Sequence, residues 1–295
     1  MKIKAAALAL AVCLPLACKQ KEQVHTPQTP QEMYERVREL LQPNVEHDAS
    51  EFDEAMVWLH KAAEAGLLQA QTDLGGIYLE GGKNGIKANG KEAFFWFSKA
   101  AEQGSKEALY YQGLILHRGL DMPKDEAQAL GYWEQAAHKG VAEAQYSLGL
   151  ALAQQAGSMQ QAVQWLTKAV EAPAPKLAAQ AACALGNIYA TGKNGIARNM
   201  PEAARWYEIA ARGGDASAQL VYAIMLLQGE PVPQDAKQGM SYLRMAAGQD
   251  YPQAIALLVN ILRNNDATDE SEQEANAWME RLEHLRTKAP KAPAN

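Results

Sequence analysis

The chain has 295 residues, 48% of them hydrophobic, with 34 acidic against 28 basic side chains and a formal net charge of −6. This apolar share excludes a chain that is disordered throughout, and the acidic balance without a run of Lys or Arg argues against a nucleic-acid partner. Alanine accounts for 55 residues, Phe for only four, and no alternating Val/Ile/Thr run occurs, so the composition favours an all-α protein over a β-sheet protein.

Residues 1–17 have the features of a secretory signal peptide. Lys2 and Lys4 precede an uncharged apolar stretch from Ala5 to Leu16. This stretch is too short to span a bilayer as a mature helix. We therefore leave it out of the predicted fold.

The end of this segment, Leu16-Ala17-Cys18, resembles a bacterial lipobox, in which the cysteine is lipidated and becomes the new N-terminus. It departs from that pattern at Pro15, where Leu is commonest. Lys19 is not the Asp that typically retains lipoproteins at the inner membrane, so the resemblance implies an outer-membrane anchor facing the periplasm. Residues 18–30 are then the lipidated cysteine and a flexible tether. The alternative is a plain secretory signal that leaves a free cysteine nearby.

Tryptophan recurs along the chain at steps near 37 residues, and Tyr242 fills the one empty place. Several of these tryptophans are followed by an Ala pair and a Gly, as Trp96 is by Ala100-Ala101-x-x-Gly104. This spacing places Trp and Ala on one helical face, and Gly ends the helix. We expect the row to form the core. Its members are Trp58, Trp96, Trp133, Trp165, Trp206, Tyr242 and Trp278.

Another helix is predicted after each of these Gly residues, and it is the first helix of the next helix pair. In four copies this first helix carries Gly at one register. Gly inside a helix costs about 1 kcal/mol relative to Ala, so its recurrence predicts close helix–helix contact. The Gly-rich loops at 82–86 and 192–196 lack the Ser or Thr and the spacing of a phosphate-binding loop, so we interpret them as turns. These helices begin at Ala70, Ala108, Ala144, Ala181, Ala218 and Ala254, and the glycines are Gly75, Gly113, Gly149 and Gly186.

This pattern, A-x-x-x-L-G-x-x-Y-x-x-G followed by a loop and A-x-x-W/Y-x-x-K-A-A-x-x-G, resembles the Sel1-like repeat (SLR), a subfamily of the tetratricopeptide repeats. The resemblance implies an all-α fold, a right-handed alpha-alpha superhelix (solenoid) of about six to seven helix hairpins over residues 31–286. The departures are a shortened turn and an Ala-Pro-Ala-Pro linker at 172–175, Ala223 in place of a helical Gly, and a polar last pair that suits a capping unit. Residues 287–295 are predicted to be a disordered tail.

The sequence offers little catalytic chemistry. The His residues show no metal-ligand spacing, and no nucleophile motif is present. We therefore expect no cofactor, no metal, no small-molecule substrate and no enzymatic activity. Cys183 is interpreted as a small packed hydrophobe, with an unpaired thiol as the alternative.

Resemblance to the tetratricopeptide family places a protein-binding groove on the concave face, at four positions of the first helix of each pair. The alternative is that Leu114, Leu150 and Ile224 simply pack between adjacent helices. The candidate binding residues are Tyr110, Leu114, His117, Arg118, Tyr146, Leu150, Gln154, Asn187, Ile224 and Gln228.

Three functions fit these features. The first is a lipid-anchored, periplasm-facing adaptor in an envelope assembly or secretion system, because SLR lipoproteins resemble such factors. The second is an immunity protein that binds and inhibits a toxin, such as a lipase, delivered to the periplasm. The third is a cell-wall-acting enzyme, which would need a clustered acid or nucleophile.

Overall fold

A computed structural model of the chain describes residues 27–42, 48–81, 86–192, 194–264 and 268–288. All regular secondary structure in these ranges is helical, which confirms the predicted all-α fold. The fourteen helices are α1 (Pro30–Leu40), α2 (Ala49–Glu64), α3 (Leu68–Glu80), α4 (Gly90–Glu102), α5 (Lys106–Arg118), α6 (Glu126–His138), α7 (Ala142–Gln154), α8 (Met159–Val170), α9 (Pro175–Thr191), α10 (Met200–Arg212), α11 (Ala216–Gln228), α12 (Ala236–Gly248), α13 (Pro252–Asn264) and α14 (Asp269–Lys288).

Three predicted segments fall wholly or mainly outside the described residues. The signal peptide at 1–17 and Cys18 lie outside them, as does the tether up to residue 26. The predicted end of the solenoid at residue 286 falls two residues before the end of α14, and the remaining tail, 289–295, is outside the described ranges.

The chain divides into two compact units, residues 1–67 and 68–295. In the first unit α1 packs on α2, where Val37, Ala55 and Leu59 are buried. An ion pair of 3.1 Å joins Arg36 Nη2 of α1 to Glu54 Oε1 of α2. This division was not predicted from the repeat pattern.

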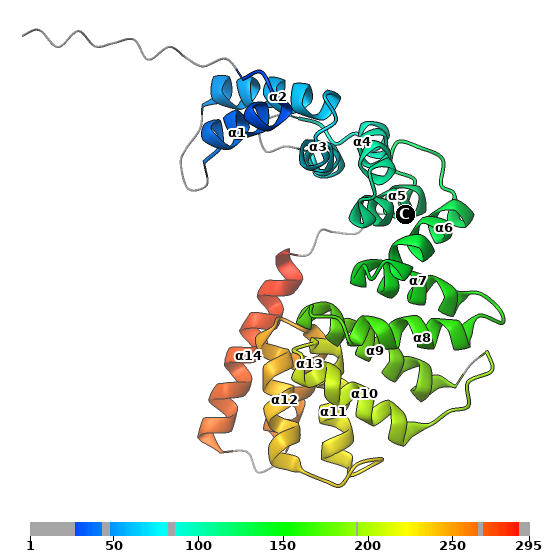
Figure 1. Cartoon of the computed structure of the whole chain (residues 1–295). Coiled ribbons are helices and arrows are strands. Elements are labelled where there is room, and N and C mark those ends of the chain that lie inside the picture. Colours follow the sequence, from blue (N-terminus) through cyan, green and yellow to red (C-terminus); the bar gives the residue numbers. More distant parts are fainter. Residues whose placement is uncertain (1–26, 43–47, 82–85, 193, 265–267, 289–295) are drawn as a thin grey trace, which may run out of the picture. The chain divides into compact units, whose positions relative to one another are not determined.

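In the second unit each helix from α3 to α14 packs against the next helix of the chain (Figure 1). The connections are short, so consecutive helices run antiparallel and form hairpins. Helix α7 also contacts α9, the first helix of the following hairpin. With α1 and α2 there are seven hairpins among the described residues, as an alpha-alpha superhelix of helix-hairpin repeats requires. No helix in the described ranges is long and apolar enough to cross a membrane.

Side-chain caps set where two of the first helices, α5 and α11, begin. Ser105 Oγ accepts a hydrogen bond of 3.1 Å from the Ala108 amide, and Asp215 Oδ1 accepts one of 2.8 Å from the Ala218 amide. These caps satisfy amides that have no partner within the helix, and α5 and α11 therefore start two residues before the predicted alanines. Helix α9 starts earlier still, with Pro175 in its first turn.

The recurring glycines of the first helices lie where a side chain of the following helix enters. A Cβ atom on Gly75 would lie 2.6 Å from Phe97 Cε1, and one on Gly113 would lie 2.6 Å from Trp133 Cδ1. The same relation joins Gly149 to Leu166 and Gly186 to Tyr207. The predicted close helix–helix contact at these glycines is therefore confirmed.

The tryptophan row is not one buried core, contrary to the prediction. Trp96, Trp133 and Tyr242 are buried, but the other members are only half-buried. In most of the second helices the fully packed side chain is the next residue along the chain. These buried neighbours are Leu59, Phe97, Leu166, Tyr207 and Leu243. The half-buried members are Trp58, Trp165, Trp206 and Trp278.

Trp133 also stands one residue out of the predicted register. Two residues separate it from Ala136, whereas three separate Trp96 from Ala100. Trp133 therefore takes the place of Phe97 and faces a helical glycine, as Phe97 does. The place of Trp96 is taken in α6 by the preceding residue, Tyr132.

Three half-buried tryptophans carry a cation on the ring. The Lys61 ammonium lies 4.4 Å from the Trp58 ring centroid, and the Lys168 ammonium lies 4.2 Å from that of Trp165. The Arg281 guanidinium lies 5.5 Å from the ring centroid of Trp278. In each case the cation comes three residues after Trp, on the same helical face. Its aliphatic stem and charge cover the ring. The Arg281 guanidinium also forms an ion pair with the carboxylate of Asp250.

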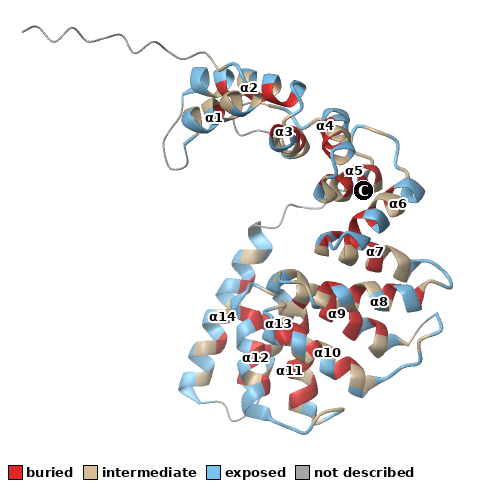
Figure 2. Cartoon of the chain, viewed as in Figure 1, coloured by how far each residue is buried: buried red, intermediate tan, exposed pale blue. Residues whose placement is uncertain are grey.

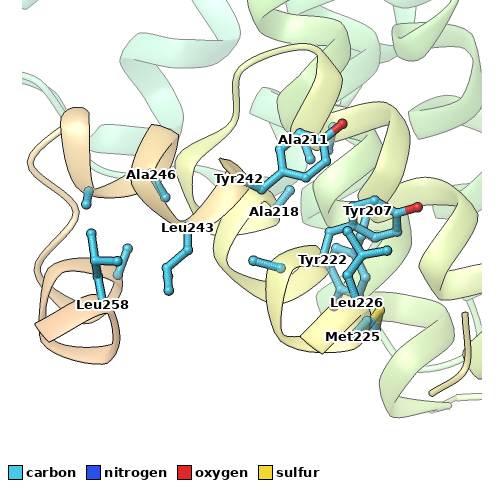
Figure 3. Packing of buried hydrophobic residues seen from close by; sticks show 14 of the residues in the cluster. Tyr207, Ala211, Ala218, Tyr222, Met225, Leu226, Tyr242, Leu243, Ala246 and Leu258 are labelled. Atoms are coloured by element: carbon cyan, nitrogen blue, oxygen red, sulfur yellow. The ribbon is translucent and has the colours of Figure 1, made fainter. Parts of the chain in front are cut away.

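Buried residues line the faces where successive helices meet, while exposed residues cover the outer surfaces (Figure 2). The largest cluster runs from α9 to α14 and mixes small alanines with aromatic and branched side chains. Figure 3 shows Tyr207, Tyr222 and Tyr242 gathered with Ala211 and Ala218 in this cluster. Bulky side chains thus fill the space that alanines leave between closely packed helices.

Candidate functional site

A groove of about 660 Å³ opens between the first helices of two neighbouring hairpins, α5 and α7, with α6 beneath it and the start of α9 at its side. Both α5 and α7 are antiparallel to α6, so they run in the same direction. The lining residues are Tyr110, Leu114, His117 and Arg118 of α5; Glu126, Leu130 and Trp133 of α6; Glu143, Tyr146, Ser147, Leu150, Ala151 and Gln154 of α7; and Gln155, Leu177 and Gln180.

Trp133 holds the floor of the groove in place. Gly113 leaves room for its ring against α5. Its Nε1 donates a hydrogen bond of 3.1 Å to the carbonyl oxygen of Tyr110. This bond satisfies the buried indole N–H and ties α6 to the residue that begins the groove wall.

An ion-pair cluster borders the floor. Glu126 Oε2 lies 2.8 Å from His117 Nδ1, and Glu126 Oε1 lies 2.6 Å from Lys124 Nζ. These two partners, Lys124 first, lower the pKa of Glu126. The imidazole of His117 lies against Trp133, with ring centroids 5.0 Å apart.

Two half-buried tyrosines form the walls. Burial raises the pKa of Tyr110, and a hydrogen bond with Ser147 of the opposite wall lowers it in part. Burial likewise raises the pKa of Tyr146. Both phenols therefore stay neutral at physiological pH and offer a donor and an acceptor to a ligand.

Seven of the ten predicted binding residues meet in this groove. They are Tyr110, Leu114, His117, Arg118, Tyr146, Leu150 and Gln154. Leu114 and Leu150 are half-buried, and Leu150 also packs against the adjacent core. The packing expected by the alternative is therefore seen for Leu150, and the binding role of both leucines stays a prediction.

The other three predicted residues do not line the groove. Asn187 Oδ1 accepts a hydrogen bond of 2.7 Å from the hydroxyl of Tyr207. Ile224 is half-buried and Gln228 is exposed on α11. The prediction took one register along every first helix, but the groove is lined by residues from α5 to the start of α9.

The sequence interpretation missed lining residues on three helices. On α7 it missed Glu143, Ser147 and Ala151, which lie outside the four helix positions that it used. Leu130 and Trp133 belong to a second helix, and the prediction considered only first helices. Leu177 and Gln180 precede Ala181, where α9 was predicted to begin. The proline at residue 175, a frequent first residue of helices, was the signal for an earlier start.

Cys183 is buried in α9, as expected for a small packed hydrophobe. Burial, followed by the nearby carboxylate of Asp215, raises the pKa of its thiol to about 12. The nucleophilic thiolate is therefore scarce at neutral pH. Across the described ranges no three His, Cys, Asp or Glu side chains come close enough to hold a metal ion.

The Sel1 repeat model matches six consecutive segments of the chain, at residues 44–67, 68–105, 106–141, 142–173, 179–215 and 216–257. A Sel1 repeat protein from Oxalobacter formigenes has a similar structure, with a TM-score of 0.69 and 25% identity, covering 80% of this chain and 96% of that one. A protective antigen of uropathogenic Escherichia coli with an SLR fold gives a TM-score of 0.73 at 27% identity, covering 89% of this chain and 57% of that one.

Among curated proteins, the chitin synthase regulator SKT5 of Saccharomyces cerevisiae is 25% identical over 274 residues, covering 77% of this chain and 39% of its own length. Chitin synthase regulatory factor 3 of Schizosaccharomyces pombe is 34% identical over 94 residues, covering 32% of this chain and 10% of its own. The chain thus spans well under half the length of these relatives. The six matched segments cover more than half of the chain, and the four between residues 68 and 215 each correspond to one helix hairpin, so the protein belongs to the Sel1 repeat family.

Proposed function

We propose that this protein is a non-catalytic scaffold that binds a protein partner in the groove between α5 and α7. The observation that carries the proposal is the lining itself, where Tyr110, Tyr146, Leu114 and Leu150 present half-buried surface in an open groove. Tyrosine and arginine are both enriched among the residues that dominate protein–protein binding energy. The rim of the groove supplies such an arginine, Arg118.

The electrostatics of the groove argue against Glu126 as a general acid. Lys124 and His117 lower the pKa of Glu126, the carboxyl group at the floor. A general acid working at neutral pH needs the opposite shift. The curated relatives named above are regulators of an enzyme, which also favours a regulatory or adaptor role.

We further propose that the scaffold is a lipoprotein adaptor in the cell envelope, anchored through Cys18 to the outer membrane on its periplasmic side. The support is the signal-like segment at 1–17 and its lipobox-like end. Several acyl chains on one cysteine would give firm anchoring, at about 0.8 kcal/mol per buried methylene.

Replacing both groove tyrosines, Tyr110→Ala with Tyr146→Ala, is expected to reduce recovery of the partner roughly tenfold or more, because each is a candidate hot-spot side chain. The measurement is quantitative mass spectrometry of proteins co-purified from the native host. A matched control carries Tyr189→Ala and Tyr251→Ala, two half-buried tyrosines outside the groove lining. Equal partner recovery by wild type and the groove variant, with helical signal retained, would move the binding site elsewhere.

The lipid anchor predicts that the chain incorporates radioactive palmitate in cells. Cys18→Ala is expected to abolish the label and to shift the protein from the membrane fraction to the soluble one. Cys183→Ala is the control, because that thiol is buried and should leave labelling unchanged. Labelling that persists in Cys18→Ala would disprove the lipobox assignment while leaving the groove proposal untouched.

A further inference from the structure

Two charged side chains of the groove have no ionic partner. Arg118 and Glu143 are exposed, line the groove, and form no ion pair with another described residue. Two further polar side chains of the lining, His117 and Glu126, lie against each other, with His117 Nδ1 2.8 Å from Glu126 Oε2. A ligand therefore meets one unpaired positive and one unpaired negative charge.

These two charges lie at opposite ends of the groove. Arg118 is the last residue of α5, and Glu143 is the second residue of α7. Helices α5 and α7 run in the same direction, so the end of α5 at Arg118 lies beside the end of α7 at Gln154. Glu143 lies near the other end of α7. At 1.5 Å of rise per residue, the eleven steps from 143 to 154 span roughly 16 Å. An extended strand of roughly five residues covers that length.

The stretch between the charges is mainly apolar, although the His117–Glu126 pair also lines the groove. Leu114, Leu150 and the ring of Trp133 line it, with Leu130 beside them on α6. Trp133 is held in this position by the hydrogen bond from its Nε1 to the α5 backbone. A large apolar side chain from a partner would bury its surface here.

We infer that the groove binds an extended partner segment of about five residues with an acidic side chain at the Arg118 end, a large apolar side chain at the centre and a basic side chain at the Glu143 end. This inference rests on the proposed function of the groove. The polar groups of Tyr110, Tyr146 and Gln180 are available to the backbone of the segment. The segment thus has a defined polarity, set by charge complementarity at both ends.

The test is selection of a random twelve-residue peptide library displayed on phage, with the full chain as bait. A parallel bait carries Arg118→Glu and Glu143→Lys together, which swaps the two charges and keeps the net charge constant. Wild type is expected to enrich peptides with an acid and a base about four residues apart, flanking Leu, Phe or Met. The swapped bait should enrich the same spacing with acid and base exchanged, because a groove between helices prefers one chain direction.

Selected peptides are then measured one by one by fluorescence anisotropy. Arg118→Glu is expected to weaken binding of the wild-type peptides roughly tenfold, since an attraction becomes a repulsion. The control, Lys237→Glu, makes the same change of charge at an exposed position of α12 outside the groove. Unchanged circular dichroism of each variant shows that the helices are intact.

The outcomes separate this inference from the proposed function. The enriched peptides could lack the charge pair and still bind less well to the Leu114→Ala variant than to wild type. That result would overturn the charge rule and leave the groove as the binding site. Peptides whose binding is insensitive to both Leu114→Ala and Tyr110→Ala overturn the groove itself. Displacement of the selected peptides by a synthetic peptide of residues 289–295, or by a second copy of the chain, overturns the inference of a separate partner. A selection without enrichment overturns the linear segment, and the tyrosine variants then decide the proposed function independently.

Discussion

Phe97→Ala is expected to lower the free energy of unfolding by about 3–5 kcal/mol, the usual cost of truncating a large core aromatic. The Phe97 side chain is fully buried, and its ring stacks on Tyr111 with centroids 4.8 Å apart and planes within 14° of parallel. Its other side fills the space beside Gly75. Removal of the ring leaves a cavity between α3, α4 and α5, which urea unfolding followed by circular dichroism should detect.

The matched control lies two residues earlier on the same helix. Phe95 is 48% exposed and contacts Trp96 edge to face, so Phe95→Ala is expected to cost less than about 1 kcal/mol. Similar losses for Phe95→Ala and Phe97→Ala would contradict the assignment of Phe97 to the core.

The second large effect is a contrast between two adjacent glycines of α3. A Cβ atom on Gly75 would lie 2.6 to 2.8 Å from three atoms of the Phe97 ring, which cannot move because it is packed on both sides. We expect Gly75→Ala to destabilise the protein by about 1–3 kcal/mol, as overpacking does. At Gly76 the same Cβ atom meets nothing within 4 Å, so Gly76→Ala should stabilise the helix by up to about 1 kcal/mol.

A double-mutant cycle identifies the cause of this contrast. If the Phe97 ring is the obstacle, Gly75→Ala should cost less in a Phe97→Ala background than in the wild type, because the new methyl group then enters the vacated space. Additive losses would place the strain of Gly75→Ala elsewhere. A stability gain from Gly75→Ala in the wild type would contradict the close contact of α3 and α4.

The positions of the helices were predictable because the repeat combines local signals with periodicity. The alanine pairs, the glycines that end helices and the linker at 172–175 predicted where helices stop, and the linker is indeed the connection between α8 and α9. The predicted first residues of the helices were less accurate. The reason is that the caps, such as Ser105 and Asp215, and the proline at residue 175 lie outside the positions that recur in the repeat.

Burial within the repeat was harder to predict than position. Tryptophan is conspicuous in the sequence, yet an aromatic ring at the edge of a core can be covered by a cation three residues later, as Lys168 covers Trp165. The residue that meets the helical glycine packs more deeply. A shift of one residue, as at Trp133, moves a side chain about 100° around the helix, from the edge of the core to its centre.

The sequence by itself determined that this protein is a chain of helix hairpins. Helix propensity and turn glycines act on neighbouring residues, and the period near 37 residues shows that the same local unit recurs. The sequence also placed seven groove residues correctly along α5 and α7. Only the tertiary structure decided that these residues share a groove with Trp133 and Leu130 of α6, and that Asn187, Ile224 and Gln228 do not. The reason is that a groove depends on how far neighbouring helices stand apart, and that spacing is set by the side chains packed between them rather than by any one repeat.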